Sequence, residues 1–220
     1  HVQALDDQIQ GYLTTVEELA SRVTDPAAFV AVLGDRARCM PADRLFVTDT
    51  HVDFLNREPI GPADALIENA AGLLYDHAEV TTIHPSAEGD VELVYDLGEQ
   101  AIGYYDFELI APAGVVVDIY SVEYINPNGQ IQHTVGNRNG LRYITRKGLN
   151  RFVSMKRRSG RYLFVTLRNQ ASDDQLPGDV IIRRLRLIES TYPVNMAGSF
   201  RCSDERLTRI WEIAARTLKL

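Results

Sequence analysis

Acidic side chains are the residues of this sequence that could do chemistry, because a pair of them can act as general acid and general base. Hydrolysis of a glycosidic bond by such a pair needs two carboxyl groups several ångströms apart and aimed at one bond. The candidates are Asp53, Glu58, Asp96, Asp106, Glu108, Asp118 and Glu123. Most occupy positions where a strand would turn its polar side to solvent. We therefore interpret each as a solvent-facing residue, and the sequence pairs none of them.

Arginine and aromatic residues follow one another in the segment "LRYITRKGLNRFVSMKRRSGRYLF", residues 141–164. Such side chains could stack on a sugar and hydrogen-bond to it, with Arg142, Tyr143 and Arg146 as candidate contacts. A strand offers a second interpretation, because alternate side chains point to opposite faces. The aromatic residues would then lie inside, and the arginines outside, paired with the excess of acid. We favour this structural interpretation and keep the sugar contact as an alternative.

Neither a metal site nor a cofactor is predicted. The His residues form no HExxH motif, and no GxSxG nucleophile motif occurs. Cys39 and Cys202 lie far apart with no CxxC pair, so we interpret them as two buried thiols. A disulfide between them stays open at this point.

Composition excludes several classes of protein. The chain has 220 residues, of which 45% are hydrophobic and 24% charged, and this balance is typical of a globular protein. The formal net charge of -7 argues against a nucleic-acid partner. No run of about eighteen apolar residues could cross a membrane. The first residues lack the basic and apolar regions of a signal peptide, which slightly favours the cytoplasm and leaves the compartment open.

Periodicity divides the chain into three segments. Residues 1–75 predict helices and loops, with apolar residues at spacings of three and four in the first 23 positions. Residues 76–192 predict an antiparallel β-sandwich, jelly-roll-like, because short β-rich runs are separated by turn residues with no helix between them. Those runs are "DVELVYDLG", "AIGYYDFELIAPAG", "VVVDIYSVEY", "RYIT", "NRFVSM", "GRYLFVTLRN" and "DVIIRRLRLIES". Residues 193–220 predict a linker and a final helix. The fold class is thus mainly β, with N-terminal helices and one C-terminal helix.

The final helix has an apolar face and no stop signal. Ser203 is its predicted N-cap. Four large side chains fall on one face at helical spacing: Leu207, Ile210, Trp211 and Leu218. The face could fold back on the sandwich or pack on a further helical domain. Because no glycine or proline ends the helix, we favour packing between domains.

Three stretches of the sequence resemble bacterial α-L-rhamnosidases of glycoside hydrolase family 78. They are "ELVYDLGEQAIGYYDFELIAPAGVVVDI", "NGLRYITRKGLNRFVSMKRRSGRYLFVTLRN" and "ESTYPVNMAGSFRCSDERLTRIWEIAARTLKL". The resemblance covers about residues 80–220 and is most specific in its last thirty, in the pattern "STYPV…GSFRCSD…L..IWEI…TL.L". Residues 1–75 resemble no family that we can name.

The resemblance implies a β-sandwich that precedes an (α/α)6 barrel, with the final helix leading into that barrel. Family members release rhamnose with inversion, using one carboxylic acid and one carboxylate of the barrel. None of those catalytic residues falls on a position of this sequence, so we expect the segment to be a non-catalytic accessory region. Its expected partners are the barrel and, through the parent enzyme, a rhamnose-containing glycoside. Two alternatives stay open, a stand-alone carbohydrate-binding module and a protein-interaction domain.

Overall fold

The computed structural model describes residues 38–40, 59–73, 79–125, 131–132, 139–170 and 178–220. These residues belong to two compact units, one that ends at Glu189 and one that includes Ser190–Leu220, and each is described by itself. The helices predicted in the first 35 residues lie outside the described residues, as does most of the predicted segment 1–75.

The first unit is built from antiparallel strands. In the described residues they are β1 (Arg38–Met40), β2 (Gly61–Pro62), β3 (Ile67–Glu68), β4 (Thr81–Ile83), β5 (Asp90–Ala111), β6 (Val116–Val122), β9 (Gly140–Ile144), β10 (Gly148–Val153), β11 (Arg158–Arg168) and β12 (Val180–Glu189). Their order is β3-β4-β12-β5-β11-β6-β9, with β10 and β1 also beside β5 and β2 beside β1. A separate ribbon joins β7 (Tyr124–Ile125) to β8 (Ile131–Gln132), and two short 3-10 turns, Asp64–Leu66 and Ala70–Leu73, flank β3.

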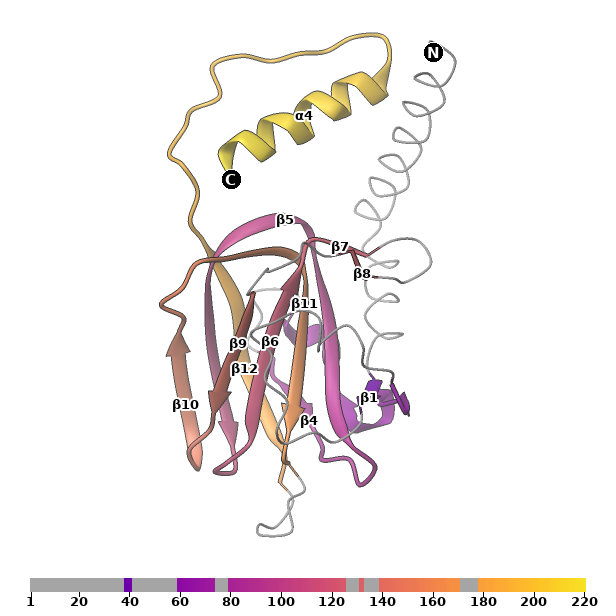
Figure 1. Ribbon diagram of the computed structural model, residues 1–220, viewed down its shortest axis with the longest axis vertical. Coiled ribbons are helices and arrows are strands. Elements are labelled where there is room, and N and C mark those ends of the chain that lie inside the picture. Colours follow the sequence, from indigo (N-terminus) through magenta and orange to yellow (C-terminus); the bar gives the residue numbers. More distant parts are fainter. Residues whose placement is uncertain (1–37, 41–58, 74–78, 126–130, 133–138, 171–177) are drawn as a thin grey trace. The chain divides into compact units, whose positions relative to one another are not determined.

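Strand β5 is long enough to serve two layers. Its residues 91–96 pair with residues 162–167 of β11 in one layer, whereas its residues 101–103 pair with residues 158–160 of β11 and its residues 103–110 pair with β12. Between them Gly98 has φ +82°, a conformation that suits glycine, and Figure 1 shows β5 arching over one end of the sandwich. We call the first part of β5 with β11, β6 and β9 the β11 layer. The second part of β5 with β10, β12, β4 and β3 is the β12 layer.

This continuity corrects one prediction. The sequence pattern predicts two separate strands, "DVELVYDLG" and "AIGYYDFELIAPAG". In the structure both runs belong to the single strand β5. A strand that bends from one layer to the other is a known way to close the corner of a β-sandwich. The predicted sandwich itself is confirmed, since the described part of this unit is antiparallel sheet folded into two layers.

The core lies between the two layers. Tyr105, Phe107 and Leu109 of β5 point into it at alternate positions and are buried. The ring of Phe107 meets the ring of Tyr143 in β9 edge to face, with centroids 5.2 Å apart. The hydroxyl of Tyr105 hydrogen-bonds to the hydroxyl of Ser121 in β6. These contacts join the layers directly. Buried residues of the β11 layer facing this core include Val117, Ile119, Leu163, Val165 and Leu167.

The β11 layer is buried on its outer face as well. Phe164 lies directly opposite Val94 and Tyr120, and these side chains point away from the β12 layer. They belong to a cluster whose members are all buried: Val94, Tyr120, Val122, Ile125, Tyr162 and Phe164. Alternation along these strands therefore does not separate a buried face from a solvated one, as it would in a sheet covered on one side.

The described part of the second unit is an extended segment followed by α4 (Glu205–Lys219). The N-cap is Asp204, whose Oδ1 accepts a hydrogen bond from the backbone N–H of Arg206 at 3.0 Å, so the prediction of Ser203 was wrong by one residue. Both are good caps, and Asp204 adds a negative charge at the positive end of the helix dipole. At the other end, the N–H of Tyr192 donates to the carbonyl of Lys219.

Cys202 precedes this cap. It is exposed and forms no disulfide, which corrects the prediction of a buried thiol at this position. Its Sγ donates to the carbonyl of Asp204 at 3.0 Å, a local contact of the turn that enters α4. Cys39 lies in β1.

Candidate functional site

Four of the predicted solvent-facing carboxylates are buried instead. They are Asp96, Asp106, Glu108 and Asp118, each at most 7% exposed and each ion-paired with at least one arginine. The prediction was wrong for these four because a buried carboxylate stays charged only beside a partner, and the neighbouring strands supply arginines. Glu123 is exposed, as predicted. Asp53 and Glu58 lie outside the described residues.

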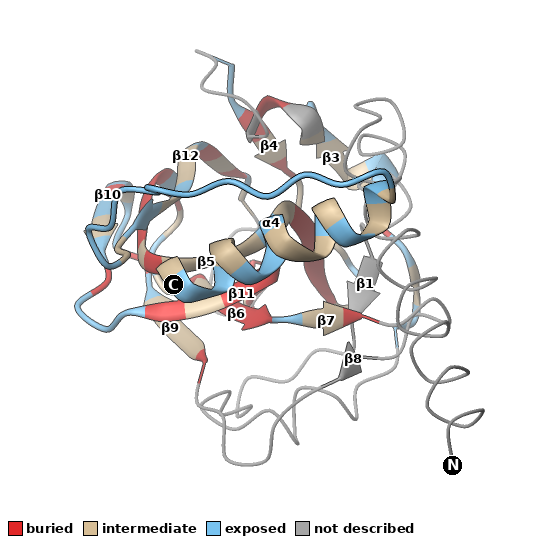
Figure 2. Cartoon of the chain, turned by 90° about the horizontal axis from the view of Figure 1, so that it is seen from above, coloured by how far each residue is buried: buried red, intermediate tan, exposed pale blue. Residues whose placement is uncertain are grey.

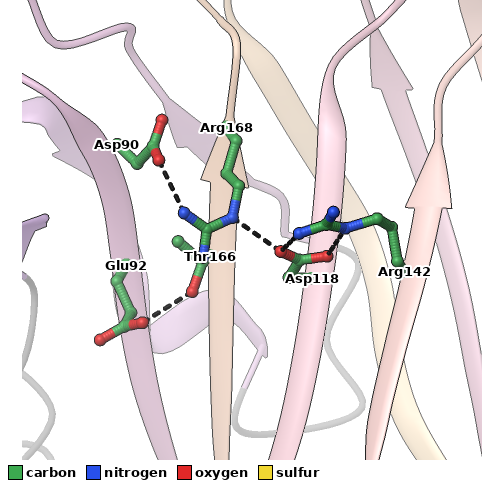
Figure 3. Close-up of polar contacts among 6 residues, drawn as sticks. All are labelled: Asp90, Glu92, Asp118, Arg142, Thr166 and Arg168. Atoms are coloured by element: carbon green, nitrogen blue, oxygen red, sulfur yellow. Dashed lines mark hydrogen bonds and ion pairs between the residues drawn. The ribbon is translucent and has the colours of Figure 1, made fainter. Parts of the chain in front are cut away.

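A chain of ion pairs crosses the outer face of the β11 layer (Figure 3). Asp90 of β5 accepts a hydrogen bond from Nη1 of Arg168 in β11 at 2.9 Å. Nε of Arg168 donates to Asp118 of β6 at 2.7 Å. Arg142 of β9 donates through Nε and Nη2 to the two oxygens of Asp118, each at 2.7 Å. We call these four residues the ion-pair ladder, since each comes from a different one of four adjacent strands.

Strand register explains why these side chains meet. Thr166 of β11 lies directly opposite Glu92 in β5 and Asp118 in β6, and Asp118 lies opposite Arg142 in β9. Directly opposed residues of antiparallel strands share a face, so polar residues here form a row across the sheet. The Thr166 hydroxyl donates to Glu92 at 2.6 Å. Arg168, two residues further along β11, is on the same face and reaches diagonally to Asp118.

The ladder is closed to solvent at its centre. The side chain of Arg168 is 1% exposed and that of Asp118 is 3% exposed, whereas that of Arg142 is 28% exposed. In such a setting an ion pair gives little net stability, but removal of one partner costs about 3–5 kcal/mol because the other charge stays buried. Arg168, Asp90, Glu92 and Thr166 were missed by sequence reasoning. The available signal was the arginine that directly follows the largely apolar run "YLFVTL".

The outer face of the β12 layer holds two more buried carboxylates, Asp106 and Glu108. Asp106 accepts hydrogen bonds from Arg184 at 3.0 Å and from Arg186 at 2.7 Å. Burial acts to raise the pKa of Asp106, but these two hydrogen bonds outweigh it and hold the pKa below its ordinary value. Glu108 is paired with Arg151 at 2.8 Å and with Arg183 at 2.9 Å.

These arginines stay at the surface. Their side chains are between 38% and 65% exposed, above carboxylates that are 4% and 8% exposed. We call Arg151, Arg183, Arg184 and Arg186 the arginine face.

The paired carboxylates do not suit acid–base hydrolysis. A glycosidase dyad needs one carboxylic acid with a raised pKa and one carboxylate free to act as base or nucleophile. Asp106 has a lowered pKa, and Asp118 accepts hydrogen bonds from two guanidinium groups. Asp96 accepts two hydrogen bonds from Arg161, at 2.7 and 2.8 Å. The arrangement pairs all three with arginine side chains and ties neighbouring strands together.

The three candidate sugar contacts do not lie on one surface. Arg142 is on the outer face of β9 with its guanidinium engaged by Asp118. The next residue, Tyr143, points between the layers, where its ring also packs against Phe152 and its hydroxyl donates to Asn150 at 3.2 Å. Arg146 lies in the turn before β10, and its Nε donates to the carbonyl of Leu149. Contact of these residues with a sugar stays a prediction.

The residues predicted to pack between domains lie on a helix with no buried residue (Figure 2). Leu207 is 47% exposed and Leu218 is 85% exposed, whereas Ile210 and Trp211 are partly covered. The segment before the helix also exposes apolar side chains that sequence reasoning did not single out: Tyr192, Val194, Met196 and Phe200. Their even spacing, apolar at nearly every second position, was the available signal.

Other polar clusters of the described residues give less support to a functional site. His84 lies between Asp179, with Nδ1 at 2.9 Å, and Glu68, with Nε2 at 3.2 Å, and hydrogen bonds to these two carboxylates raise its pKa. Within the described ranges, no three His, Cys, Asp or Glu side chains gather as metal ligands. No helix of the described part is both long and apolar enough to cross a membrane.

Comparison with known proteins identifies this sandwich. Residues 86–182 match the family model described as "Bacterial alpha-L-rhamnosidase concanavalin-like domain". A family GH78 rhamnosidase of Bacillus sp. GL1 has 38% sequence identity and a TM-score of 0.64, over 74% of this chain and 16% of that chain. A rhamnosidase from Klebsiella oxytoca, solved with rhamnose bound, has 16% identity and a TM-score of 0.49, over 84% of this chain and 34% of that chain. No curated protein matches.

The fold and the family match define a concanavalin-like β-sandwich domain. More particularly, the chain carries a region of the α-L-rhamnosidases of glycoside hydrolase family 78. It spans 16% of the length of the Bacillus rhamnosidase that it matches.

Proposed function

We propose that this chain is a non-catalytic accessory region of an α-L-rhamnosidase. The parent enzyme hydrolyses terminal α-L-rhamnosides with inversion, by a general acid and a general base that lie outside these 220 residues. The sandwich serves as a scaffold, and α4 leads into the helical barrel that carries the active site. The rhamnoside is therefore a partner of the parent enzyme rather than of the sandwich alone.

One observation carries this proposal. The carboxylates that the sandwich buries at Asp96, Asp106, Glu108 and Asp118 all accept hydrogen bonds or ion pairs from arginine. A carboxylate held in that way is a poor candidate for a general acid, because its oxygens already accept hydrogen bonds from guanidinium groups and do not face a substrate. The family supplies the reaction, and the pairing argues that this segment does not perform it.

The direct test is an activity assay of the purified 220-residue protein with 4-nitrophenyl α-L-rhamnoside. We expect no release of nitrophenol above a blank without protein. The Bacillus sp. GL1 rhamnosidase serves as the positive control for the substrate. Turnover by the isolated chain that disappears in Asp118→Asn or Asp106→Asn would contradict the proposal.

The inter-domain role of α4 is supported by its apolar side chains, since Leu207 and Leu218 are exposed and Ile210 and Trp211 are only partly covered. Large apolar patches exposed on a protein usually mark an interaction surface. Analytical ultracentrifugation of the isolated chain should reveal association that weakens when Leu207 and Leu218 are both changed to Gln. A strictly monomeric chain would argue that these residues have no partner to meet.

A carbohydrate-binding module is the competing function, and titration calorimetry distinguishes it. Rhamnose and rhamnosyl oligosaccharides should release no heat of binding at millimolar concentration, since Arg142 and Tyr143 point to opposite faces of β9. Binding that is lost in Tyr143→Ala or Arg146→Ala would favour the module. Tyr143→Phe is the matched control, because it keeps the packing against Phe107.

A further inference from the structure

The outer face of the β12 layer does not have the composition of a sheet face made only for water. Its central band is the arginine face. Aliphatic side chains lie beside this band on the same three strands, and four of them are between 37% and 51% exposed: Ile110, Leu149, Val153 and Ile188. Leu149 of β10, Ile110 of β5 and Ile181 of β12 are direct cross-strand neighbours, so part of this apolar surface is one continuous row.

The cations on this face are all arginines, in a chain whose only lysines are Lys147, Lys156 and Lys219. Strands β5, β10 and β12 contain no lysine, and every cation of the face is an arginine. Arginine is enriched in protein–protein interfaces and lysine is depleted there. The planar guanidinium binds carboxylates with two parallel hydrogen bonds and loses less hydration on contact than an ammonium group.

The charge of this face indicates that its partner is negatively charged. The arginine face sets four guanidinium groups above two carboxylates, Asp106 and Glu108, so a surplus of two positive charges remains. This surplus stands out in a chain whose formal net charge is -7. The buried carboxylates also hold the arginines in place before any partner arrives, and such ordering reduces the entropy lost on binding.

We propose that the arginine face and its aliphatic neighbours dock onto an acidic protein surface that belongs to another domain of the same enzyme. This inference rests on the proposed function, which makes the chain a part of a longer rhamnosidase, and it names the face by which the sandwich is held. The aliphatic row favours a protein over an acidic polysaccharide. Side chains of a partner protein can cover a row three strands wide, whereas a single glycan chain offers mainly hydroxyl groups.

Arginine-specific footprinting tests the docking face. The isolated 220-residue chain and the longer polypeptide of the same reading frame are treated with p-hydroxyphenylglyoxal, and each arginine is followed by peptide mass spectrometry. Arg151 and Arg186 should react readily in the isolated chain. In the longer protein they should react about tenfold more slowly, as expected for an interface that is closed nine-tenths of the time. Arg146, in the turn outside the three strands, should react equally in both and is the internal control.

A charge reversal supplies the matched variants. Arg186→Glu in the longer protein should restore rapid modification of Arg151 and Arg183, because it places a negative charge against an acidic partner. Arg146→Glu should leave their protection unchanged. Equal restoration by both variants would show that protection depends on overall charge rather than on this face.

The remaining outcomes separate the two proposals. A longer protein that hydrolyses 4-nitrophenyl α-L-rhamnoside but leaves Arg151 and Arg186 as reactive as in the isolated chain overturns the docking face alone. A longer protein without that activity, or a reading frame that ends at Leu220, overturns the proposed function and the docking face with it. Protection of the isolated chain by polygalacturonate would overturn the protein partner in favour of an acidic polysaccharide.

Discussion

The two outer faces of the sandwich both pair buried carboxylates with arginines, but the arginines are buried on one face and exposed on the other. On the β11 layer the ion-pair ladder buries both members of its central pair, with Arg168 as hidden as Asp118. On the β12 layer the carboxylates of Asp106 and Glu108 are nearly as deep, but their arginines extend into solvent. Carboxylate depth is therefore a poor guide to the role of such a network. The exposure of the arginine distinguishes a closed structural element from a face that is available for contact.

The exposure of the arginine also determines how much each ion pair matters for folding stability. A buried guanidinium has lost its water and depends on its carboxylates, so its removal leaves charges that nothing else can solvate. An exposed guanidinium keeps its water on one side and contributes little to folding. The β11 layer should therefore lose stability on mutation, and the β12 layer should tolerate mutation and lose contact with its partner instead.

Substitution of the buried arginine should have the largest effect. Arg168→Met removes the guanidinium that serves both Asp90 and Asp118, and we expect a loss of about 3–5 kcal/mol in the free energy of unfolding. Urea denaturation followed by circular dichroism measures it. Arg186→Met, the same change on the exposed face, is the matched control. Equal losses in the two variants would remove the distinction between the faces.

A substitution at the point where the two layers meet should have the next largest effect on the free energy of unfolding. Gly103 of β5 pairs with Arg158 of β11 and with Glu189 of β12. A Cβ there would lie 2.0 Å from the carbonyl oxygen of Ile188. Gly103→Ala should thus cost about 1–3 kcal/mol, because the backbone of β12 must move to make room. Gly61→Ala, where a Cβ would meet no atom within 4 Å, is the control. An unchanged free energy of unfolding in Gly103→Ala would mean that β12 moves away easily and that the two layers are joined more loosely than their register indicates.

Much of the strand pattern could be predicted from the sequence. The runs "VVVDIYSVEY" and "GRYLFVTLRN" are β-rich and bounded by turn residues, and they overlap β6 and β11. The final helix was predictable for a similar reason, since its apolar residues recur at helical spacing. The bend of β5 was not predictable, because "LGEQ" interrupts the alternation in the way that a turn between two strands would.

The burial of the carboxylates could not be predicted either. Asp96 and Asp118 occupy the polar phase of their strands, and in a sheet covered on one face that phase is the solvated one. Their arginine partners are distant in sequence: Arg161 is 65 residues from Asp96, and Arg168 is 50 residues from Asp118. Only the strand register brings them together, and a single sequence does not fix which strands are neighbours.

Removal of an exposed arginine should have a small effect that depends on salt. Arg186→Met leaves Asp106 paired with Arg184, so we expect a loss of about 0–1 kcal/mol. Repeating the urea denaturation in about 1 M sodium chloride should shrink this loss further, since salt screens exposed charges. The cost of Arg168→Met should stay nearly constant with salt. A loss in Arg186→Met that resists screening would place this arginine in the same class as the ladder.

The smallest effect concerns pH and the carboxylate under the arginine face. The pKa of Asp106 is lower in the folded protein than in the unfolded chain, where it is about 3.9. Its contribution to stability is therefore fully present above pH 3.9 and is lost as the pH falls through the lower, folded value. The difference in the free energy of unfolding between the wild type and Asp106→Asn should be constant near pH 6 and should shrink toward pH 3. Glu123→Gln, at an exposed position, serves as the control for general acid effects. A difference that stays constant across this range would mean that Arg184 and Arg186 do not hold the Asp106 carboxylate in its charged form. Asp106 would then not fix the positions of these two arginines before a partner binds.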